Sequence, residues 1–290
     1  MFKKSIILTS VIFFSFGGIF VYQLVKFNDN RLHLVICDVG QGDAIFIRTS
    51  TGSNILIDGG PDDLVLNCLA RHMPFWDKKI QAIILTHPPA DHYTGLISVL
   101  KRYEVMSYDT EKVENPGFGT KLLQDELAVE NLSAKYLQKG DRLTNQANFR
   151  LLTVWPDTIS LQNSAITNPT EAKNLDLNGI SVIELLTYGN FRALLTGDAG
   201  VLVEDIIAKD VGKIDVLKVP HHGSRTGMSD NFLTQINPEI AIISVGAKNL
   251  YGHPAKVALD LLTKYQIKTV RTDRDEVEII SDGKSWKIVN

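Results

Sequence analysis

The chain has little cysteine, no large excess of charge of either sign and no visible internal repeat. Its 290 residues include two cysteines, too few for the disulfide framework of a small secreted domain. The net charge of −3 gives no sign of the basic surface that binds nucleic acid non-specifically, although a local basic strip is compatible with it. The hydrophobic fraction of 44% excludes a disordered chain and is sufficient for a large core.

The two cysteines give no clear information on the redox compartment. Cys37 lies in the apolar run His33–Val39, where cysteine usually behaves as a small buried hydrophobic residue. Its pairing with Cys68 cannot be read from the sequence. We therefore expect two buried thiols rather than a disulfide.

Long uncharged runs are scarce too, but one begins near the N-terminus. Lys3 and Lys4 precede the uncharged stretch Ser5–Val25, which ends at Lys26. At about 1.5 Å per residue, its roughly 21 residues cover about 30 Å, the thickness of the hydrocarbon core of a bilayer. This length favours a single-pass transmembrane helix.

We accordingly expect residues 1–30 to be an uncleaved membrane anchor with a short linker, and residues 31–290 to be one domain close to the membrane. The lysines before the stretch predict that this domain is extracytoplasmic. The alternative is a signal peptide, with Ser15-Phe16-Gly17 as a weak cleavage site.

Beyond the anchor, short apolar runs alternate with amphipathic ones. The expected strands are Leu32–Val39, Ala44–Arg48, Asn54–Ile57, Ile80–Leu85, Arg150–Val154, Ser181–Thr187, Phe191–Leu195, Ile214–Val219, Ile240–Val245, Lys268–Arg271, Glu276–Ile280 and Trp286–Val289. The expected helices are Asp62–His72, Gly95–Tyr103, Leu122–Val129, Val201–Lys209, Asp230–Gln235 and Lys256–Tyr265. Pro156–Asn178 is expected to be a long loop. This order of elements predicts an α/β fold of two sheets with helices on the outer faces.

Histidine and aspartate recur just after the apolar strands. The residues placed in this way are His87, His92, His221, His222, His253, Asp58 and Asp198. Because strand ends on one edge of a sheet converge, we expect these side chains to meet in one cleft.

Two parts of this set point to a metal site. The segment Thr86-His87-Pro88-Pro89-Ala90-Asp91-His92 offers imidazole nitrogen and carboxylate oxygen, the usual donors for zinc, manganese or iron. Alone, it could equally be a proline-rich turn. Asp198 and the His221-His222 pair each follow an apolar strand, where an unpaired buried charge is costly. The candidate metal ligands are therefore His87, Asp91, His92, Asp198 and His221.

The order of these motifs resembles the metallo-β-lactamase superfamily. The motifs that carry the resemblance are Ile57-Asp58-Gly59-Gly60, the His87–His92 segment, Gly197-Asp198 and His221. More narrowly, the chain resembles the soluble domain of ComEC competence proteins from about Leu32 onwards, and it has no counterpart of their multi-helix channel. The motifs shared with that group are Asp38-Val39-Gly40-Gln41-Gly42-Asp43-Ala44, Leu195-Thr196-Gly197-Asp198, Val219-Pro220-His221-His222-Gly223-Ser224 and Tyr251-Gly252-His253-Pro254. The resemblance implies an αββα sandwich and a divalent zinc or manganese ion.

The chain departs from the superfamily pattern at two ligand positions. The third position of His-x-His-x-Asp-His is Pro89, which offers no side-chain donor, and the next expected histidine is absent near Leu177-Asn178. The resemblance then leaves His87 alone in a depleted first site. The second site, complete by position, would consist of Asp91, His92, His221 and a bridging Asp198. We expect one tightly bound ion and a weak or absent second one.

The resemblance also suggests roles for other residues. Asp58 is expected to orient a histidine ligand or its loop. His253 is expected to donate a proton or contact a phosphate, unless it is a surface histidine beside Pro254. The expected catalytic residues are Asp58, Asp91, Asp198 and His253. The expected substrate contacts, each with an ordinary turn as the alternative, are Gln41, Asp43, His222, Ser224 and Arg225.

The expected metal ligands and catalytic residues together predict a hydrolase. A metal with an open position lowers the pKa of its bound water towards ~7, which suits attack on a phosphorus or acyl centre. The resemblance to ComEC proteins implies a phosphodiesterase, and a nuclease acting on DNA. The alternatives are a hydrolase of another ester (phosphorylcholine, thioester or lactam) and a metal-poor, non-catalytic surface module of a DNA-uptake system. The sequence indicates no protein partner.

Overall fold

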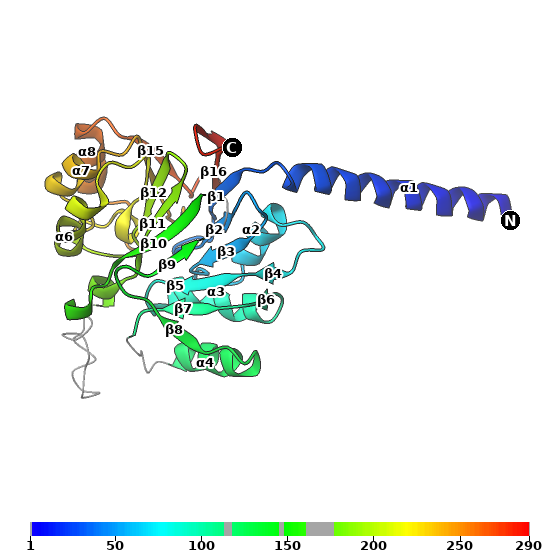
Figure 1. Cartoon of the computed structure of the whole chain (residues 1–290), viewed down its shortest axis with the longest axis horizontal. Coiled ribbons are helices and arrows are strands. Elements are labelled where there is room, and N and C mark those ends of the chain that lie inside the picture. The colour runs from blue at the N-terminus through cyan, green and yellow to red at the C-terminus, as the bar shows by residue number, and fades with distance from the viewer. Residues whose placement is uncertain (1, 113–117, 145–147, 161–176, 290) are drawn as a thin grey trace.

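The computed structural model describes residues 2–112, 118–144, 148–160 and 177–289, without the side chains of residues 2–14 and Phe118. Two large sheets form the centre of the fold (Figure 1). The larger sheet has the order β17-β16-β1-β2-β3-β5-β7-β8, and the second has the order β15-β14-β13-β12-β11-β10-β9. A pair of short strands, β4 and β6, lies apart from both.

The strands have the following bounds. Those of the larger sheet are β1 (Leu32–Ile36), β2 (Ile45–Arg48), β3 (Asn54–Ile57), β5 (Ala82–Leu85), β7 (Tyr108–Thr110), β8 (Ala134–Tyr136), β16 (Val277–Ser281) and β17 (Trp286–Val289). Those of the second are β9 (Arg142–Thr144), β10 (Phe149–Trp155), β11 (Ile183–Tyr188), β12 (Phe191–Leu195), β13 (Val216–Lys218), β14 (Ile240–Ile243) and β15 (Lys268–Arg271). The separate pair is β4 (Lys79–Ile80) and β6 (Glu104–Val105).

Helices lie on the outer face of each sheet (Figure 1). The larger sheet is covered by α2 (Val65–His72), α3 (Ala90–Leu100) and α4 (Phe118–Val129). The second sheet is covered by α6 (Val201–Val211), α7 (Asp230–Ile236) and α8 (Lys256–Lys264). Other described elements are two 3-10 turns, η2 (Leu177–Ile180) and η3 (Pro220–Gly223), and the N-terminal helix α1 (Phe2–Phe27).

Three apolar layers hold the sheets and helices together. Alternate side chains of a strand point to opposite faces, so Ile45 and Ile47 of β2 enter the layer between the sheets while Phe46 packs under the helices. Leu186 and Leu195 face the same central layer from the second sheet. This is the predicted sandwich of two sheets between two layers of helices.

The structure differs from the sequence prediction mainly in its shortest elements. The strands β6, β7, β8 and β9 have only two or three residues each and were not predicted, because alternation of apolar and polar residues cannot be recognised over so short a run. The predicted strand Ile80–Leu85 is divided between the end of β4 and β5. Helix α3 begins at Ala90, directly after Pro89, so the helical pattern seen from Gly95 onwards starts about one turn earlier and includes Asp91 and His92, which were expected to open the helix. The predicted loop Pro156–Asn178 falls largely on residues 161–176, which lie outside the described residues.

The expectation of two free thiols was wrong. Cys37, just after β1, forms a disulfide with Cys68 on α2, and both residues are fully buried. The sequence could not show this because the two residues are 31 positions apart and meet only when α2 packs on the larger sheet. Two histidines outside the candidate site have structural contacts: His33 pairs with Glu278, and His72 pairs with Glu276.

Helix α1 covers the predicted anchor and projects away from the sandwich (Figure 1). Among the residues whose side chains the structure describes, no helix has both the length and the apolar character needed to cross a membrane. Residues 5–14 of the predicted anchor lie outside that set. The predicted membrane span therefore stays a prediction.

Removal of the disulfide should destabilise the domain. Because the bridge closes a loop of 31 residues, chain entropy predicts a loss of about 3–4 kcal/mol in the free energy of unfolding. Urea unfolding with and without a reductant measures this loss. The Cys37→Ala/Cys68→Ala variant should have the free energy of unfolding of the reduced chain, with or without the reductant. A parent chain that is equally stable in both conditions would contradict the disulfide.

Candidate metal centre

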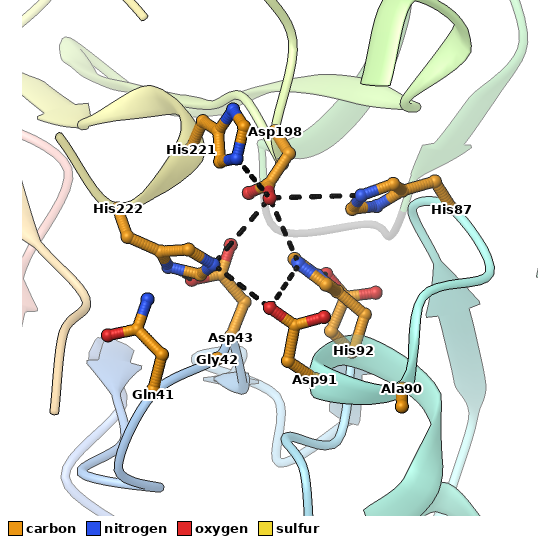
Figure 2. Close-up of polar contacts among 12 residues, drawn as sticks. Gln41, Gly42, Asp43, His87, Ala90, Asp91, His92, Asp198, His221 and His222 are labelled. Atoms are coloured by element: carbon orange, nitrogen blue, oxygen red, sulfur yellow. Dashed lines mark hydrogen bonds and ion pairs between the residues drawn. The ribbon is translucent and has the colours of Figure 1, made fainter. Parts of the chain in front are cut away.

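The predicted ligands gather at one edge of the sandwich, where elements of both sheets end. His87 follows β5, and Asp91 and His92 lie in the first turn of α3. Asp198 follows β12, and His222 lies in η3 directly after β13. Residues that are more than 100 positions apart in the sequence are thereby brought into contact (Figure 2).

Asp198 lies at the centre of this group. Four imidazole Nε2 atoms surround its Oδ2, at 3.4 Å (His92), 3.6 Å (His222), 3.8 Å (His87) and 3.8 Å (His221). Burial raises the pKa of Asp198, but the charges of His222 and His92 outweigh this effect and hold the pKa well below its usual range. The central carboxylate is therefore ionised.

Four donor atoms lie close enough together to bind one ion. We name Asp91 Oδ2, His92 Nε2, Asp198 Oδ2 and His222 Nε2 the four-donor cluster. Besides the two distances to Asp198, Asp91 Oδ2 lies 3.9 Å from His92 Nε2 and 3.5 Å from His222 Nε2. A tetrahedral ion with bonds of about 2.0–2.2 Å separates its ligand atoms by about 3.3–3.6 Å. Two carboxylates and two neutral imidazoles also carry the charge that balances a divalent cation.

Hydrogen bonds to the opposite ring nitrogens turn Nε2 of both histidines towards the centre. His92 Nδ1 donates to Asp58 at 2.8 Å, and His222 Nδ1 donates to the Ser244 carbonyl at 3.0 Å. Among the described residues, neither Nε2 has a hydrogen-bond partner. Burial lowers the pKa of His222, but Asp198 and Asp43 outweigh it and raise the pKa to about 9. An ion would displace this proton, and the donor set fits a metal.

Asp58 is the residue that fixes His92. Its backbone has a left-handed conformation (φ 59°), and its carboxylate lies against the His92 ring. Besides the bond from His92, Asp58 Oδ2 accepts a hydrogen bond from Thr86 Oγ1 at 2.7 Å, and Oδ1 accepts one from the Thr86 amide at 2.8 Å. Asp58 itself is outside the four-donor cluster.

The side of the site around His87 and His221 has fewer donors. His87 Nδ1 donates to Thr86 Oγ1 at 3.0 Å, because the hydroxyl proton of Thr86 is already given to Asp58. On the opposite side, Asn178 stands beside His221, with its Nδ2 3.4 Å from Nδ1 of the ring. Pro89 forms the N-cap of α3 without contributing a side-chain donor. On this side of the site, the described residues offer three possible metal ligands: the imidazoles of His87 and His221 and the carboxylate of Asp198.

The two adjacent histidines differ in burial and in their distance from the other donors. From the sequence we expected His221 to be a ligand and His222 to be a substrate contact. In the structure, His222 is 2% exposed and belongs to the four-donor cluster, whereas the His221 side chain is 31% exposed. Both have left-handed backbones (φ 47° and 54°), a conformation that costs about 1–3 kcal/mol and occurs often at functional sites.

Lys218 is a residue of the site that sequence analysis missed. It is fully buried in β13, and its ammonium group donates to Asp43 and to the Gly197 carbonyl. Its Nζ also lies 3.9 Å from Asp198 Oδ1. A lysine in an otherwise apolar strand was the available signal, because a buried ammonium needs a partner.

Asp43 is consequently not at the surface of the cleft, where the sequence analysis placed it as a substrate contact. Its carboxylate is fully buried, pairs with Lys218 and lies 3.4 Å from His222 Nδ1. Burial raises its pKa, but Lys218 and His222 outweigh this effect and lower it. Gly42 before it has no space for a Cβ, because the Asp91 backbone passes there.

The other predicted contacts lie around the edge of the site. Gln41 is partly buried and accepts a hydrogen bond from the Gly246 amide, whereas Ser224 is buried and Arg225 is exposed. The ring centroid of His253 lies 5.8 Å from that of His221. Burial and the neighbouring His221 lower the pKa of His253, so its neutral form predominates at pH 7.

Comparison with known sequences identifies relatives. A family model described as the metallo-beta-lactamase superfamily matches residues 37–247. ComE operon protein 3 of Bacillus subtilis is 30% identical over 283 residues, covering 89% of this chain and 33% of that protein. Recombination protein 2 of Haemophilus influenzae is 30% identical over 233 residues, covering 79% of this chain and 26% of the relative. The chain spans about a third or less of each of these relatives.

Solved structures share the fold at low sequence identity. Zn²⁺-bound PqqB from Methylobacterium extorquens has a TM-score of 0.56 and 12% identity, over 85% of this chain and 99% of that one. The metallo-beta-lactamase fold protein YhfI from Bacillus subtilis has a TM-score of 0.54 and 13% identity, over 83% and 96% of the two chains. These similarities show the fold alone.

Asp58→Asn should weaken metal binding without unfolding the chain. Asparagine tolerates the left-handed backbone, but its side chain has one acceptor oxygen, whereas Asp58 accepts hydrogen bonds at both carboxylate oxygens. We expect the affinity for Zn²⁺ or Mn²⁺ to fall roughly 10–100-fold by calorimetric titration. Asp109→Asn, a change at another buried carboxylate, is the matched control. Equal affinities for Asp58→Asn and the parent would disprove the orienting role.

The same substitution at the two adjacent histidines distinguishes their roles. His222→Asn removes one of the four clustered donors, so the metal affinity should fall by roughly 100-fold or more. His221→Asn, at an equally left-handed position, should lower it by about tenfold or less. Titration with the two metals measures both variants. The opposite order would restore the assignment made from the sequence.

Proposed function

This chain belongs to the metallo-beta-lactamase superfamily, and we propose that it is a metal-dependent phosphodiesterase that acts on DNA. Its curated relatives are ComEC-like competence proteins, as the motifs predicted. The observation that carries the proposal is the four-donor cluster, whose donor atoms all lie within 4.8 Å of one another and three of whose residues, His92, Asp198 and His222, are buried. Such a set is costly to bury unless a cation compensates it.

The residues of the chain have separate tasks in this proposal. Asp91, His92, Asp198 and His222 would hold the ion, with zinc or manganese as the candidates. A cation held there supplies Lewis-acid chemistry to a phosphoryl oxygen. Asp58 and the Ser244 carbonyl keep the two histidine rings in position. Lys218 balances charge beside Asp198.

Substrate contacts would come from the edge of the site. Arg225 and Lys248 are exposed and suit phosphate oxygens. Tyr251 is 74% exposed and lies parallel to His253, with ring centroids 6.1 Å apart. Exposed aromatic rings stack on unpaired bases, which supports single-stranded DNA as a substrate. The neutral His253 would donate a ring N–H to a phosphate oxygen.

The location of the domain is also a proposal. We propose that α1 attaches the chain to a membrane and that the domain lies outside the cytoplasm. Disulfides persist in oxidising compartments, and the Cys37–Cys68 bridge supports that side. Exposed apolar side chains near the end of α1, including Phe16 (68%) and Val25 (73%), support an apolar environment for the helix.

A second candidate is a non-catalytic module that has lost its metal. The feature that favours it is the lack of side-chain donors at Pro89, together with Asn178 beside His221. The complete four-donor cluster on the opposite side favours the hydrolase.

Hydrolysis and metal content, measured together on the full chain, test the proposal. After supplementation we expect about one equivalent of Zn²⁺ or Mn²⁺ and cleavage of bis(p-nitrophenyl) phosphate and single-stranded DNA. Asp198→Asn should lower the rate roughly 100–1,000-fold, because it removes the central charge. Glu184→Gln is the matched control, since burial raises the pKa of Glu184 to about 8 and leaves it neutral at pH 7.

Each contrary result has a distinct meaning. Less than about half an equivalent of metal would favour the non-catalytic module. Cleavage of a thioester, lactam or phosphorylcholine ester without cleavage of DNA would show that the substrate belongs to that class and is not DNA. Unchanged rates in Asp198→Asn would overturn the site itself.

A further inference from the structure

The connection between α2 and β4 carries two exposed aromatic side chains. Phe75 is 55% exposed and Trp76 is 40% exposed, and their rings meet edge to face at 4.9 Å. Large aromatic rings are rarely left in water next to each other unless the surface has a partner. The metal centre does not involve either residue.

The same connection contacts the end of α1. The Phe20 ring lies 4.8 Å from that of Trp76, and the Phe75 amide donates to Gln23 Oε1 at 3.0 Å. Lys26 Nζ donates to the Arg71 carbonyl at 3.1 Å. Figure 1 shows that α1 leaves the domain on the side where the α2–β4 connection projects. Phe20, Phe75 and Trp76 thus form one exposed surface, the aromatic patch.

Positive charge borders the aromatic patch. Lys26, Lys78 and Lys79 are exposed beside it. The nearby acidic residue Asp77 is half-buried and already contacts Arg48 at 3.3 Å and Asn54 at 2.9 Å. Glu104 is a second nearby acidic residue, since it is exposed and lies opposite Lys79 in the β4–β6 pair. The three lysines outnumber this exposed carboxylate, so the border carries net positive charge.

We propose that the aromatic patch lies in the headgroup region of an anionic lipid bilayer and fixes the orientation of the domain on it. Tryptophan combines an apolar body with a polar N–H, and lysine is attracted to anionic lipid, so both are enriched at this depth. Phe20 of the patch belongs to the same helix as the exposed apolar residues Phe16 and Val25, so the patch extends onto α1, which favours a lipid surface over a protein partner.

The proposal rests on the membrane attachment proposed above and defines its geometry. The bilayer boundary falls near Phe20, one to two turns before the helix ends. Ser5–Tyr22 then has about 27 Å available for the hydrocarbon core, close to the thickness of a bilayer. Lys3 and Lys4 fall at the far end of this stretch.

Fluorescence of the full chain in vesicles tests the contact. The vesicles contain phosphatidylcholine with brominated acyl chains and phosphatidylglycerol at about 3:1, because bromine quenches only tryptophan that reaches the lipid. Trp155 is 5% exposed, and Trp286 is half-buried against Phe191. We expect at least about twofold more quenching in the parent than in Trp76→Phe.

A relocated tryptophan provides the matched control. Leu202 is 83% exposed on α6, and α6 lies on the side of the domain opposite α1 (Figure 1). Trp76→Phe/Leu202→Trp has the same tryptophan count as the parent, and it should be quenched no more than Trp76→Phe. Lys78→Gln/Lys79→Gln should reduce the quenching of Trp76.

Three results would overturn the proposal in distinguishable ways. A chain that does not float with vesicles would remove the membrane attachment and the patch together. A chain that floats, but is quenched equally with and without Trp76, would remove the patch alone. Doubled mass by light scattering, with Trp76 shielded from iodide in detergent, would assign the patch to a second copy of the chain. None of these results bears on hydrolysis.

Discussion

The metal centre depends on one buried carboxylate. Asp198 stands where the ends of both sheets meet, and a charge at this depth is tolerated only if cations or polar groups compensate it. Four imidazoles approach one of its oxygens, and the ammonium of Lys218 approaches the other. Lys218 also pairs with Asp43, so its positive charge lies between two carboxylates. The need to compensate the charge of Asp198 explains why imidazole rings and the Lys218 ammonium group lie around it.

Much of the fold and the general place of the site could be predicted from the sequence. Apolar runs gave the long strands, because two buried faces leave a clear signature in four to seven consecutive residues. The placement of His92 and Asp198 just after such runs predicted that they would converge, and their side chains lie 3.4 Å apart. Short edge strands such as β9 carried too few residues for a comparable signal.

What the sequence could not show was decided by local backbone geometry and by packing. His221 and His222 are chemically identical neighbours, and the sequence does not show that the His222 ring is the one that is buried and held by the Ser244 carbonyl. Lys218 resembled an ordinary strand residue because its partners, Asp43 and Gly197, are contributed by other loops. The Cys37–Cys68 disulfide could not be predicted for a similar reason, because the two sulfurs become adjacent only when α2 packs on the larger sheet.

The four-donor cluster takes two donors from each half of the sandwich. Asp91 and His92 belong to the helix that covers the larger sheet, while Asp198 and His222 follow strands of the second. A cation bound by all four donors would link the two halves, and its binding free energy would add to the free energy of unfolding of the domain. The supply of metal where the chain matures would then govern how much assembled protein accumulates.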